Sequence, residues 1–364
     1  MKIAVVAGEL PHPEGTAAGR DLWAWCEGAR HLGHEVRAWL WMRSPSSPSG
    51  PPPPWCDEEP FTAPNRWRAH VRAVLRPRQE LELAGWCAPD DAVAVADHLW
   101  SFAAVRHAQR SVATMHFRSL LDARAVGSLT VQDVQMARAE RLAGRHAGLV
   151  VAYSARVGAG LRRPVAVVPI AFPVPTSTPA QVDEPVAALL ADWSWPPNRR
   201  ALAVLLRCWP EVRDAVPGAR LVLGGRNLER AGVGAMAGVE QVGPVASSVE
   251  VLARAAVVAF PCPASSGPKV KVLEACAYGR AVVTTASGVE GLALGAGAGA
   301  VVSDDAGFCG ALVATLRDPA GRSAMAALGR QQVESHHAPV PAAASRVAAM
   351  AKAFGLEAAP STLA

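Results

Sequence analysis

Short apolar runs alternate with helix-like stretches along most of the sequence, and this alternation constrains the fold more than any other feature. A β-branched run at residues 2–7 is followed by a glycine-containing loop, helical apolar spacing at 16–32 and a second run at 34–40. Strands that alternate with helices build a parallel sheet, because each helix returns the chain to the start of the next strand. The sequence therefore predicts an α/β fold that begins with a βαβ unit.

The alternation occurs in two series. In the first, further strands are expected at 92–96, 112–116 and 149–152. In the second, strands are expected at 186–192, 220–224, 256–260, 281–285 and 300–302, and helices at 198–212, 249–253, 269–278 and 307–317. A length of 364 residues also suits two domains.

Between the two series, residues 169–185 are rich in Pro, Thr and Ser, as a linker would be. We predict two doubly wound Rossmann-like domains, 1–170 and 186–340, which face each other across a cleft. The linker is expected at 171–185, and the last segment, 341–364, should form a helix that crosses back to the first domain. A Pro- and Ser-rich stretch at 44–54 is predicted to be a surface loop.

Composition narrows the classes of function. The net charge of +5 is mild, and arginines alternate with acids without a basic run that aromatics interrupt, so no nucleic-acid partner is expected. The seven cysteines have neither metal-ligand nor redox spacing, which favours free thiols in the cytoplasm. The N-terminal apolar run is too short for a signal peptide, and no run reaches the length of a transmembrane segment.

Lysine is rare in this chain, yet two of its four lysines, Lys269 and Lys271, lie where a helix should begin. Pro268 suits the first helical position and Gly279 suits the end. The positive end of a helix disfavours cations but attracts anions, so lysines there suggest a diphosphate site. The alternative is an ion pair between Lys271 and Glu274, which would leave Lys269 unexplained.

The stretch "SGPKVKVLEACAYGRAVVTTASGVEGL" (266–292) resembles the donor-binding segment of family-4-like retaining glycosyltransferases of the two-Rossmann-domain (GT-B) type. The stretch "GELPHPEGTAAGRD" is similar to the family's N-terminal glycine loop, and "ARLVLGG" to a core strand of its second domain. The resemblance implies that Glu274 binds the ribose hydroxyls of a sugar nucleotide. It also implies that the loop "GVEGL" lies near the diphosphate.

The resemblance and the residue types together give a set of candidate site residues. His116 and Lys269 are the catalytic candidates, and His98 and Trp100 are the acceptor-binding candidates. The donor-binding candidates are Gly15, Gly225, Arg226, Ser266, Gly267, Lys269, Val270, Glu274, Gly288 and Val289. No metal ligand and no cofactor is expected besides the sugar nucleotide itself.

Two departures from the family pattern bear on the chemistry. Ser266 stands where the family often has a second acid, and "DWSWPPNRR" (192–200) replaces its usual Arg and Lys pair. Neutralisation of the phosphates is then left to Lys269 and Arg226, and we hypothesise that Lys269 compensates the charge of the leaving diphosphate.

The sequence thus predicts a cytoplasmic retaining glycosyltransferase, a hexosyl- or pentosyltransferase. Its donor would be a nucleoside-diphosphate sugar and its acceptor a hydroxyl of a small or lipid-linked molecule, in bacterial natural-product or glycan biosynthesis. Two alternatives stay open. One is a nucleotide-sugar epimerase of the same fold, although such an enzyme needs acids around the sugar and Ser266 is not one. The other is an inactive homologue that serves as a partner protein.

Overall fold

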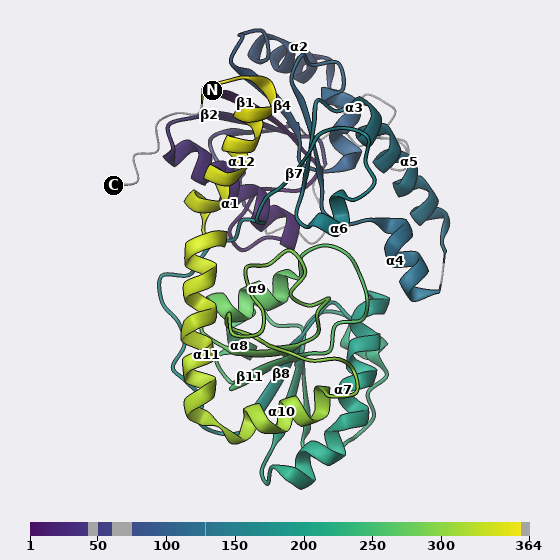
Figure 1. The fold of residues 1–364 in the computed structure, drawn as a ribbon, viewed down its shortest axis with the longest axis vertical. Coiled ribbons are helices and arrows are strands. Elements are labelled where there is room, and N and C mark those ends of the chain that lie inside the picture. The colour runs from purple at the N-terminus through teal and green to yellow at the C-terminus, as the bar shows by residue number, and fades with distance from the viewer. Residues whose placement is uncertain (43–49, 60–74, 128, 358–364) are drawn as a thin grey trace. The chain divides into compact units, whose positions relative to one another are not determined.

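The computed structural model describes residues 1–42, 50–59, 75–127 and 129–357. The chain forms two compact units (Figure 1). Unit 1 consists of Met1–Pro173 and His337–Ala364, and unit 2 consists of Val174–His336. Most of the predicted surface loop at 44–54, and the end of the chain after residue 357, lie outside the described residues.

Unit 1 is built on a parallel sheet of seven strands. The strands are β1 (Lys2–Ala7), β2 (Glu35–Leu40), β3 (Cys56–Glu58), β4 (Ala92–Ala96), β5 (Ser111–Met115), β6 (Leu149–Ala152) and β7 (Val165–Val167). Their spatial order is β3-β2-β1-β4-β5-β6-β7, so the order reverses between β1 and β4. In such sheets, ligands bind at the carboxyl ends of the strands beside this reversal.

The helices of unit 1 come from both ends of the chain. They are α1 (Ala17–His31), α2 (Pro77–Trp86), α3 (Phe102–Val105), α4 (Ser119–Val126), α5 (Val131–His146), α6 (Ala155–Gly158) and α12 (Pro339–Phe354), with a 3₁₀ turn, η2 (Leu99–Ser101). Thr16 begins α1 by accepting a hydrogen bond from the Gly19 amide at 3.1 Å. Helices α1 and α12 pack side by side (Figure 1), and Gly28 lies against the Pro339 carbonyl.

Unit 2 repeats the plan with six parallel strands in the order β10-β9-β8-β11-β12-β13. The strands are β8 (Val186–Leu190), β9 (Arg220–Gly224), β10 (Val239–Gly243), β11 (Val257–Phe260), β12 (Ala281–Thr284) and β13 (Val301–Val302). The helices are α7 (Pro196–Ala215), α8 (Val249–Leu252), α9 (Val270–Ala277), α10 (Phe308–Arg317) and α11 (Pro319–Gln332), with a 3₁₀ turn, η3 (Leu228–Ala231). A π-helical turn, η4 (Val333–His337), spans the boundary to unit 1. The strand order here reverses between β8 and β11.

The α/β class and two Rossmann-like sheets confirm the predicted fold class. The strands that the sequence did not indicate, β3, β7 and β10, are short or lie at a sheet edge. In β10, Glu240 and Gln241 interrupt the apolar pattern because no residue of this strand is fully buried.

The Pro- and Thr-rich segment is attached to unit 2 rather than stretched between two domains. Arg280 donates to the carbonyl oxygens of Pro179 and Ala180 at 2.8 and 2.7 Å. Arg330 donates to the carbonyl of Pro175 at 2.9 Å. The passage from unit 1 to unit 2 therefore lies at residues 173–174. The return passage lies at 336–337, and the C-terminal helix begins at Pro339.

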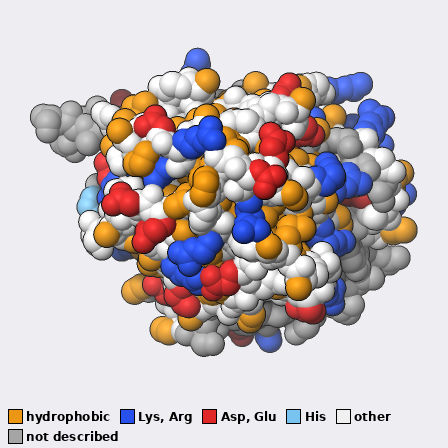
Figure 2. Space-filling model, turned by 90° about the horizontal axis from the view of Figure 1, so that it is seen from below, with side chains coloured by type: hydrophobic (Ala, Val, Ile, Leu, Met, Phe, Trp, Pro, Cys, Tyr) orange, Lys and Arg blue, Asp and Glu red, His pale blue; other side chains and the backbone are white. Residues whose placement is uncertain are grey.

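The face drawn in Figure 2 carries Lys and Arg side chains interspersed with Asp and Glu. Arg254 and Glu240, for example, form an ion pair in unit 2. A surface of mixed sign lacks the concentrated positive charge that nucleic acid attracts. No helix in the described part of the chain is both long enough and apolar enough to cross a membrane.

Candidate active site

In unit 2, the loops at the reversal of strand order bring several predicted donor-binding residues together. Gly225 directly follows β9 with φ +116°, and a Cβ there would lie 1.9 Å from the carbonyl oxygen of Ala191, so only glycine fits. Arg226 forms an ion pair with Asp192 at 3.3 Å and is half exposed. Asp192 also accepts hydrogen bonds from Ser194 and Asn227, and these partners lower its pKa even though burial opposes this.

The loop before α9 contacts the loop after β12. The amide of Gly267, at φ +77°, donates to Oε1 of Glu290 at 3.1 Å. Glu290 belongs to the "GVEGL" stretch, so Gly267 lies beside the loop that contains Gly288 and Val289. Gly288 itself packs against Thr284, because a Cβ at this position would fall 1.9 Å from the threonine hydroxyl. The loops that follow β8, β9, β11 and β12 thus form the carboxyl edge of the sheet in unit 2.

Helix α9 begins one residue later than expected, at Val270, with Lys269 at its N-cap and Pro268 outside the helix. Lys269 is 6 % exposed, and its ammonium group donates to the backbone carbonyls of Ser266, at 3.0 Å, and Gly267. The buried Ser266 occupies the place of the family acid. Lys269 thus closes its own loop through the backbone.

Lys271 takes a different direction from the same helix end. Its Nζ atom donates to Oδ1 of Asn198 at 2.6 Å and lies 4.3 Å from the centre of the Phe260 ring. Burial lowers the pKa of this ammonium group to about 8. The expected alternative, a pairing of Lys271 with Glu274, is replaced by this contact with α7.

Glu274 lies on the buried side of α9 and is 6 % exposed. Its Oε1 atom accepts a hydrogen bond of 2.7 Å from the hydroxyl of Ser248, the residue that precedes α8. This bond fixes the position of the carboxylate in the loop region where the resemblance places the ribose.

In unit 1, the predicted catalytic and acceptor residues lie together at the ends of β4 and β5. The rings of His98 and His116 stack with their centres 5.5 Å apart, and the rings of His98 and Trp100 stack at 6.1 Å. Tyr153, which follows β6, meets His116 edge-on at 5.2 Å. Gly15 lies in the loop before α1, where its amide donates to the carbonyl of His12.

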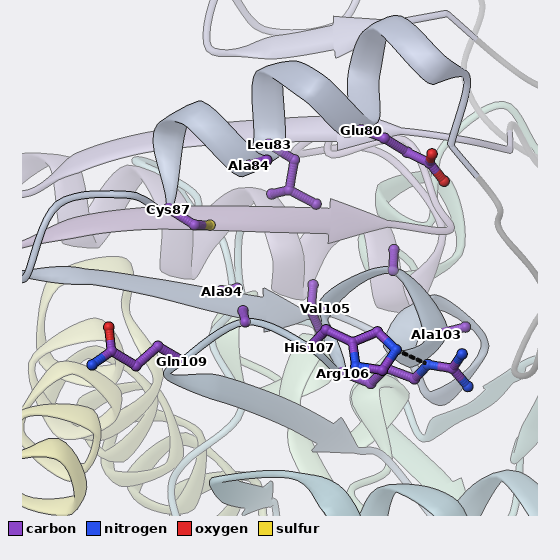
Figure 3. Close-up of a pocket in the computed structure, with 12 residues that line it drawn as sticks. Glu80, Leu83, Ala84, Cys87, Ala94, Ala103, Val105, Arg106, His107 and Gln109 are labelled. Carbon is purple, nitrogen blue, oxygen red and sulfur yellow. Dashed lines mark hydrogen bonds between the residues drawn. The ribbon is translucent and has the colours of Figure 1, made fainter.

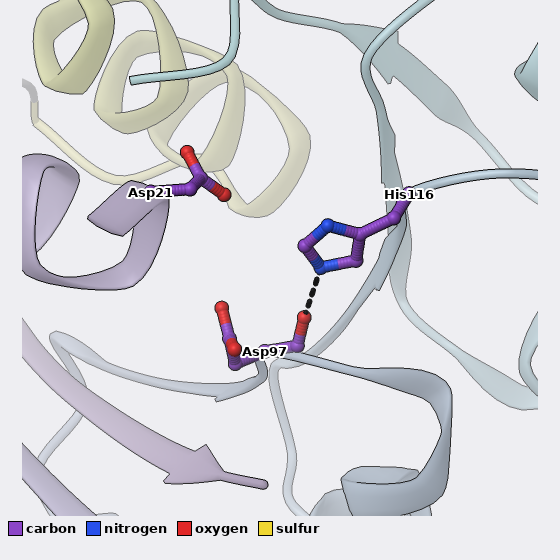
Figure 4. A group of neighbouring side chains, drawn as sticks. All are labelled: Asp21, Asp97 and His116. Carbon is purple, nitrogen blue, oxygen red and sulfur yellow. Dashed lines mark hydrogen bonds between the residues drawn. The ribbon is translucent and has the colours of Figure 1, made fainter. Parts of the chain in front are cut away.

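The side chains of Asp21, Asp97 and His116 point toward one small volume in unit 1 (Figure 4). Asp21 accepts hydrogen bonds from the Tyr153 hydroxyl and from the Ala171 amide, the latter at 2.8 Å. Both carboxylate oxygens of Asp97 are buried without a hydrogen-bond partner among the described residues. Burial, followed by the proximity of Asp21, raises the pKa of Asp97 to about 8.

The spacing of this group would admit a metal ion, because one ligand atom from each residue lies within 4.8 Å of the others. However, the buried guanidinium of Arg346, from α12, already lies in this network, where it donates to the Tyr153 hydroxyl and packs 4.5 Å from the Trp25 ring. The guanidinium thus supplies positive charge beside Asp21 and Asp97.

A cavity of about 520 Å³ lies elsewhere in unit 1, between α2 and the α3 region (Figure 3). It is lined by apolar side chains, among them Leu83, Cys87 and Val105, and by the charged side chains of Glu80 and Arg106. None of the predicted site residues lines it, so this cavity and the candidate chemistry are separate.

Sequence reasoning did not single out Ser248, Asp21 or Asp97 as site residues, and it noted Lys271 at the helix start without including it among the site candidates. Asp97 carried a usable signal, because an acid directly after the apolar strand β4 must be buried near the carboxyl edge. Asn198 was noted only as part of "DWSWPPNRR", and nothing in the sequence indicated that its partner is Lys271.

The two doubly wound sheets, with candidate residues at their carboxyl edges, define a two-Rossmann protein of the GT-B type. Residues 184–318 match the family described as Glycosyl transferases group 1, so this part of the chain is a glycosyl transferase group 1 domain. None of the curated proteins resembles the chain significantly in sequence.

Several solved structures share the fold over nearly all of the chain. A sucrose-phosphate synthase from Thermosynechococcus elongatus is 15% identical with a TM-score of 0.72, over 97% of this chain and 99% of that one. Anabaena HepE, in complex with UDP-glucose, is 15% identical with a TM-score of 0.65, over 98% and 99%. AviGT4, a glycosyltransferase involved in avilamycin A biosynthesis, is 19% identical with a TM-score of 0.58, over 97% and 98%.

Proposed function

We propose that this protein transfers a sugar, with retention of anomeric configuration, from a nucleoside-diphosphate sugar to an acceptor hydroxyl. The observation that carries the proposal is the grouping of Glu274, Lys271 and the glycine loops at the strand reversal of the glycosyl transferase group 1 domain. This is the position at which doubly wound sheets bind nucleotides.

Each part of the proposed donor site has a chemical task. The carboxylate of Glu274, oriented by Ser248, accepts hydrogen bonds from the two ribose hydroxyls. The helix end of α9 and a lysine beside it supply positive charge to the diphosphate, which carries the developing negative charge as it leaves. Gly267, Gly288 and the backbone around them allow the diphosphate to approach closely. The site needs no metal ion, because these groups neutralise the leaving group.

Unit 1 would supply the groups that handle the sugar and the acceptor. His116 is held neutral because burial lowers its pKa, so it can donate or accept a hydrogen bond without carrying charge. His98 and Trp100 offer flat ring faces of the kind that sugars and other ring-containing acceptors contact. The acceptor would be a small or lipid-linked molecule.

Two further observations bear on the donor nucleotide and on the cellular compartment. Anabaena HepE, a similar structure, was solved with UDP-glucose and with UDP, which favours a uridine diphosphate donor as the first probe. The seven cysteines are all free thiols, which suits the reducing cytoplasm of a bacterium that makes glycans or glycosylated natural products.

The test is to incubate the protein with UDP-, GDP-, ADP- and dTDP-sugars and to follow release of the nucleoside diphosphate, with Glu274→Ala as the control. An active transferase releases the nucleoside diphosphate from one donor well above the control. NMR recorded before the sugar mutarotates then shows that the released or transferred sugar has the anomeric configuration of the donor. Tight binding of a donor without turnover would instead favour the inactive partner protein. An isomerised sugar that stays on the nucleotide would favour the epimerase.

A further inference from the structure

Two lysines, Lys269 and Lys271, lie at the same helix end of the proposed donor site, and only one of them needs to bind the diphosphate. We propose that Lys271, and not Lys269, is the cation that binds the donor diphosphate, and that Asn198 is its positioning residue. This inference rests on the function proposed above and deepens it.

The ammonium group of Lys271 lies where the sheet of unit 2 is expected to bind a ligand. Phe260 is the last residue of β11, and Asn198 lies in the first turn of α7, the helix that follows β8. Lys271 Nζ contacts both, at 4.3 Å from the ring centre and 2.6 Å from Oδ1. Because β8 and β11 are the two strands between which the order reverses, the ammonium group lies at the ligand-binding point of this sheet.

The two ammonium groups also differ in the hydrogen-bond acceptors that the protein offers them. Two N–H groups of Lys269 are directed at the carbonyls of Ser266 and Gly267. For Lys271 Nζ, Asn198 is the one hydrogen-bond acceptor within the part of the chain that the structure describes. An ammonium group has three donors, so Lys271 retains N–H groups for a ligand.

Asn198 is itself held in one orientation. Its Nδ2 atom donates to the backbone carbonyl of Asp192 at 2.7 Å. A carbonyl can only accept, so the amide's NH₂ end must face Asp192 and its oxygen must face Lys271. With only 4 % of Asn198 exposed, this orientation is held by packing as well. Asn198 therefore presents a fixed oxygen to a flexible lysine.

The electrostatic surroundings favour an anionic ligand. The charged or titratable groups that act on Lys271 are Cys262, Lys269, Glu274 and Asp192. Phe260 and the burial of the ammonium group leave it poorly solvated, and its pKa near 8 means that it is held charged only weakly. A diphosphate would restore the lost solvation and hold the proton on Lys271.

The experiment compares Lys271→Met with the matched variant Lys269→Met by calorimetry. The probes are UDP, GDP, ADP or dTDP, whichever binds the wild type best, and the corresponding nucleoside. Lys271→Met should weaken diphosphate binding by about tenfold or more while nucleoside binding stays within about twofold. Lys269→Met should keep the wild-type ratio of diphosphate to nucleoside affinity.

The pH profile separates positioning from a merely structural role of Asn198. Wild-type diphosphate affinity should fall as pH rises through about 8, where free Lys271 loses its proton. Asn198→Ala removes an acceptor from the ammonium group and should move this midpoint to lower pH. Asn198→Asp adds a negative partner and should move it to higher pH, and Lys271→Met should abolish it.

The outcomes distinguish this inference from the function on which it rests. If the ratio collapses in Lys269→Met and survives in Lys271→Met, the assignment to Lys271 is overturned while the donor site stands. If both Asn198 variants leave the pH midpoint unchanged, Asn198 is not a positioning residue. If the wild type binds none of the four diphosphates, the proposed function fails, and this inference fails with it.

Discussion

Nε2 of His116 lies 2.8 Å from the backbone carbonyl oxygen of Asp97. A carbonyl oxygen only accepts, so the imidazole proton resides on Nε2, and the second ring nitrogen is turned toward Asp21 (Figure 4). The bond therefore selects one tautomer of a histidine that burial keeps neutral. It also ties the ring to the end of β4, so a ligand at His116 meets a ring in one orientation.

Replacing His116 should impair turnover and leave nucleotide binding intact. His116→Gln removes the ring from unit 1, whereas the nucleotide would bind residues of unit 2. We expect kcat to fall by about tenfold to a hundredfold with nucleoside diphosphate affinity nearly unchanged. The exposed His107 offers a matched control, and equal losses in His116→Gln and His107→Gln would argue against a role at the site.

Asp97→Asn should flatten the dependence of unit 1 stability on pH. The folded pKa of Asp97 is about 8, far above its ordinary value, so the folded state holds a proton that the unfolded state has lost. Stability therefore decreases as pH rises from about 4 toward 8. Asparagine resembles the neutral acid, so the variant should gain about 1–3 kcal/mol at pH 8 relative to wild type. Thermal melts between pH 5 and 9 measure this, and a parallel curve for the two proteins would show that Asp97 is ionised when folded.

Glu274→Ala should weaken binding of the nucleoside as well as the diphosphate. The loss of a buried carboxylate would leave the ribose hydroxyls and Ser248 without their hydrogen-bond partner. Binding should then be weaker by about 1–3 kcal/mol, which is roughly tenfold or more in affinity. Ser248→Ala should give a smaller loss, because the carboxylate remains but is less well oriented. Calorimetry with a ribonucleoside and its 2′-deoxy analogue tests the contact. A folded Glu274→Ala protein that still discriminates between them as the wild type does would contradict it.

Gly28→Ala should loosen the packing of α12 on α1. A Cβ at residue 28 would lie 1.9 Å from the Pro339 carbonyl oxygen, so the helices must move apart, at about 1–3 kcal/mol. Gly85, in α2, has no atom within 4 Å of its would-be Cβ. Gly85→Ala should therefore stabilise unit 1 by about 0.5–1 kcal/mol. Hydrogen exchange should show faster opening of α1 and α12 in the first variant alone.

The sequence predicted the parts of this protein that depend on local pattern. Apolar runs such as residues 2–7 and 220–224 became buried strands, and "SGPKVKVLEACAYGR" became a loop followed by helix α9. Periodicity and turn residues determine these features within a few positions of the chain. The candidate residues His98, Trp100 and His116 could be grouped because strand ends of one parallel sheet meet at one edge.

Contacts between distant segments could not be predicted in the same way. Spacing places Lys269 and Lys271 in the same helical turn, and only the partner 73 residues away, Asn198, distinguishes them. Asp21 and Tyr153 lie 132 residues apart, and Tyr153 and Arg346 lie 193 apart. A single sequence carries no signal for such pairs, because any buried acid needs some partner but does not specify which.

The amide of Phe172 donates to the carbonyl of His337 at 2.7 Å, so the chain leaves unit 1 and re-enters it at neighbouring points. Unit 2 is thus one continuous insertion within unit 1. During synthesis, the segment 174–336 can emerge and fold as a unit while the first 173 residues still lack α12. Until α12 arrives, Asp21 and Tyr153 have no Arg346 beside them, and the face of α1 that contains Gly28 is uncovered. The half of the protein that is made first is therefore the half that is completed last.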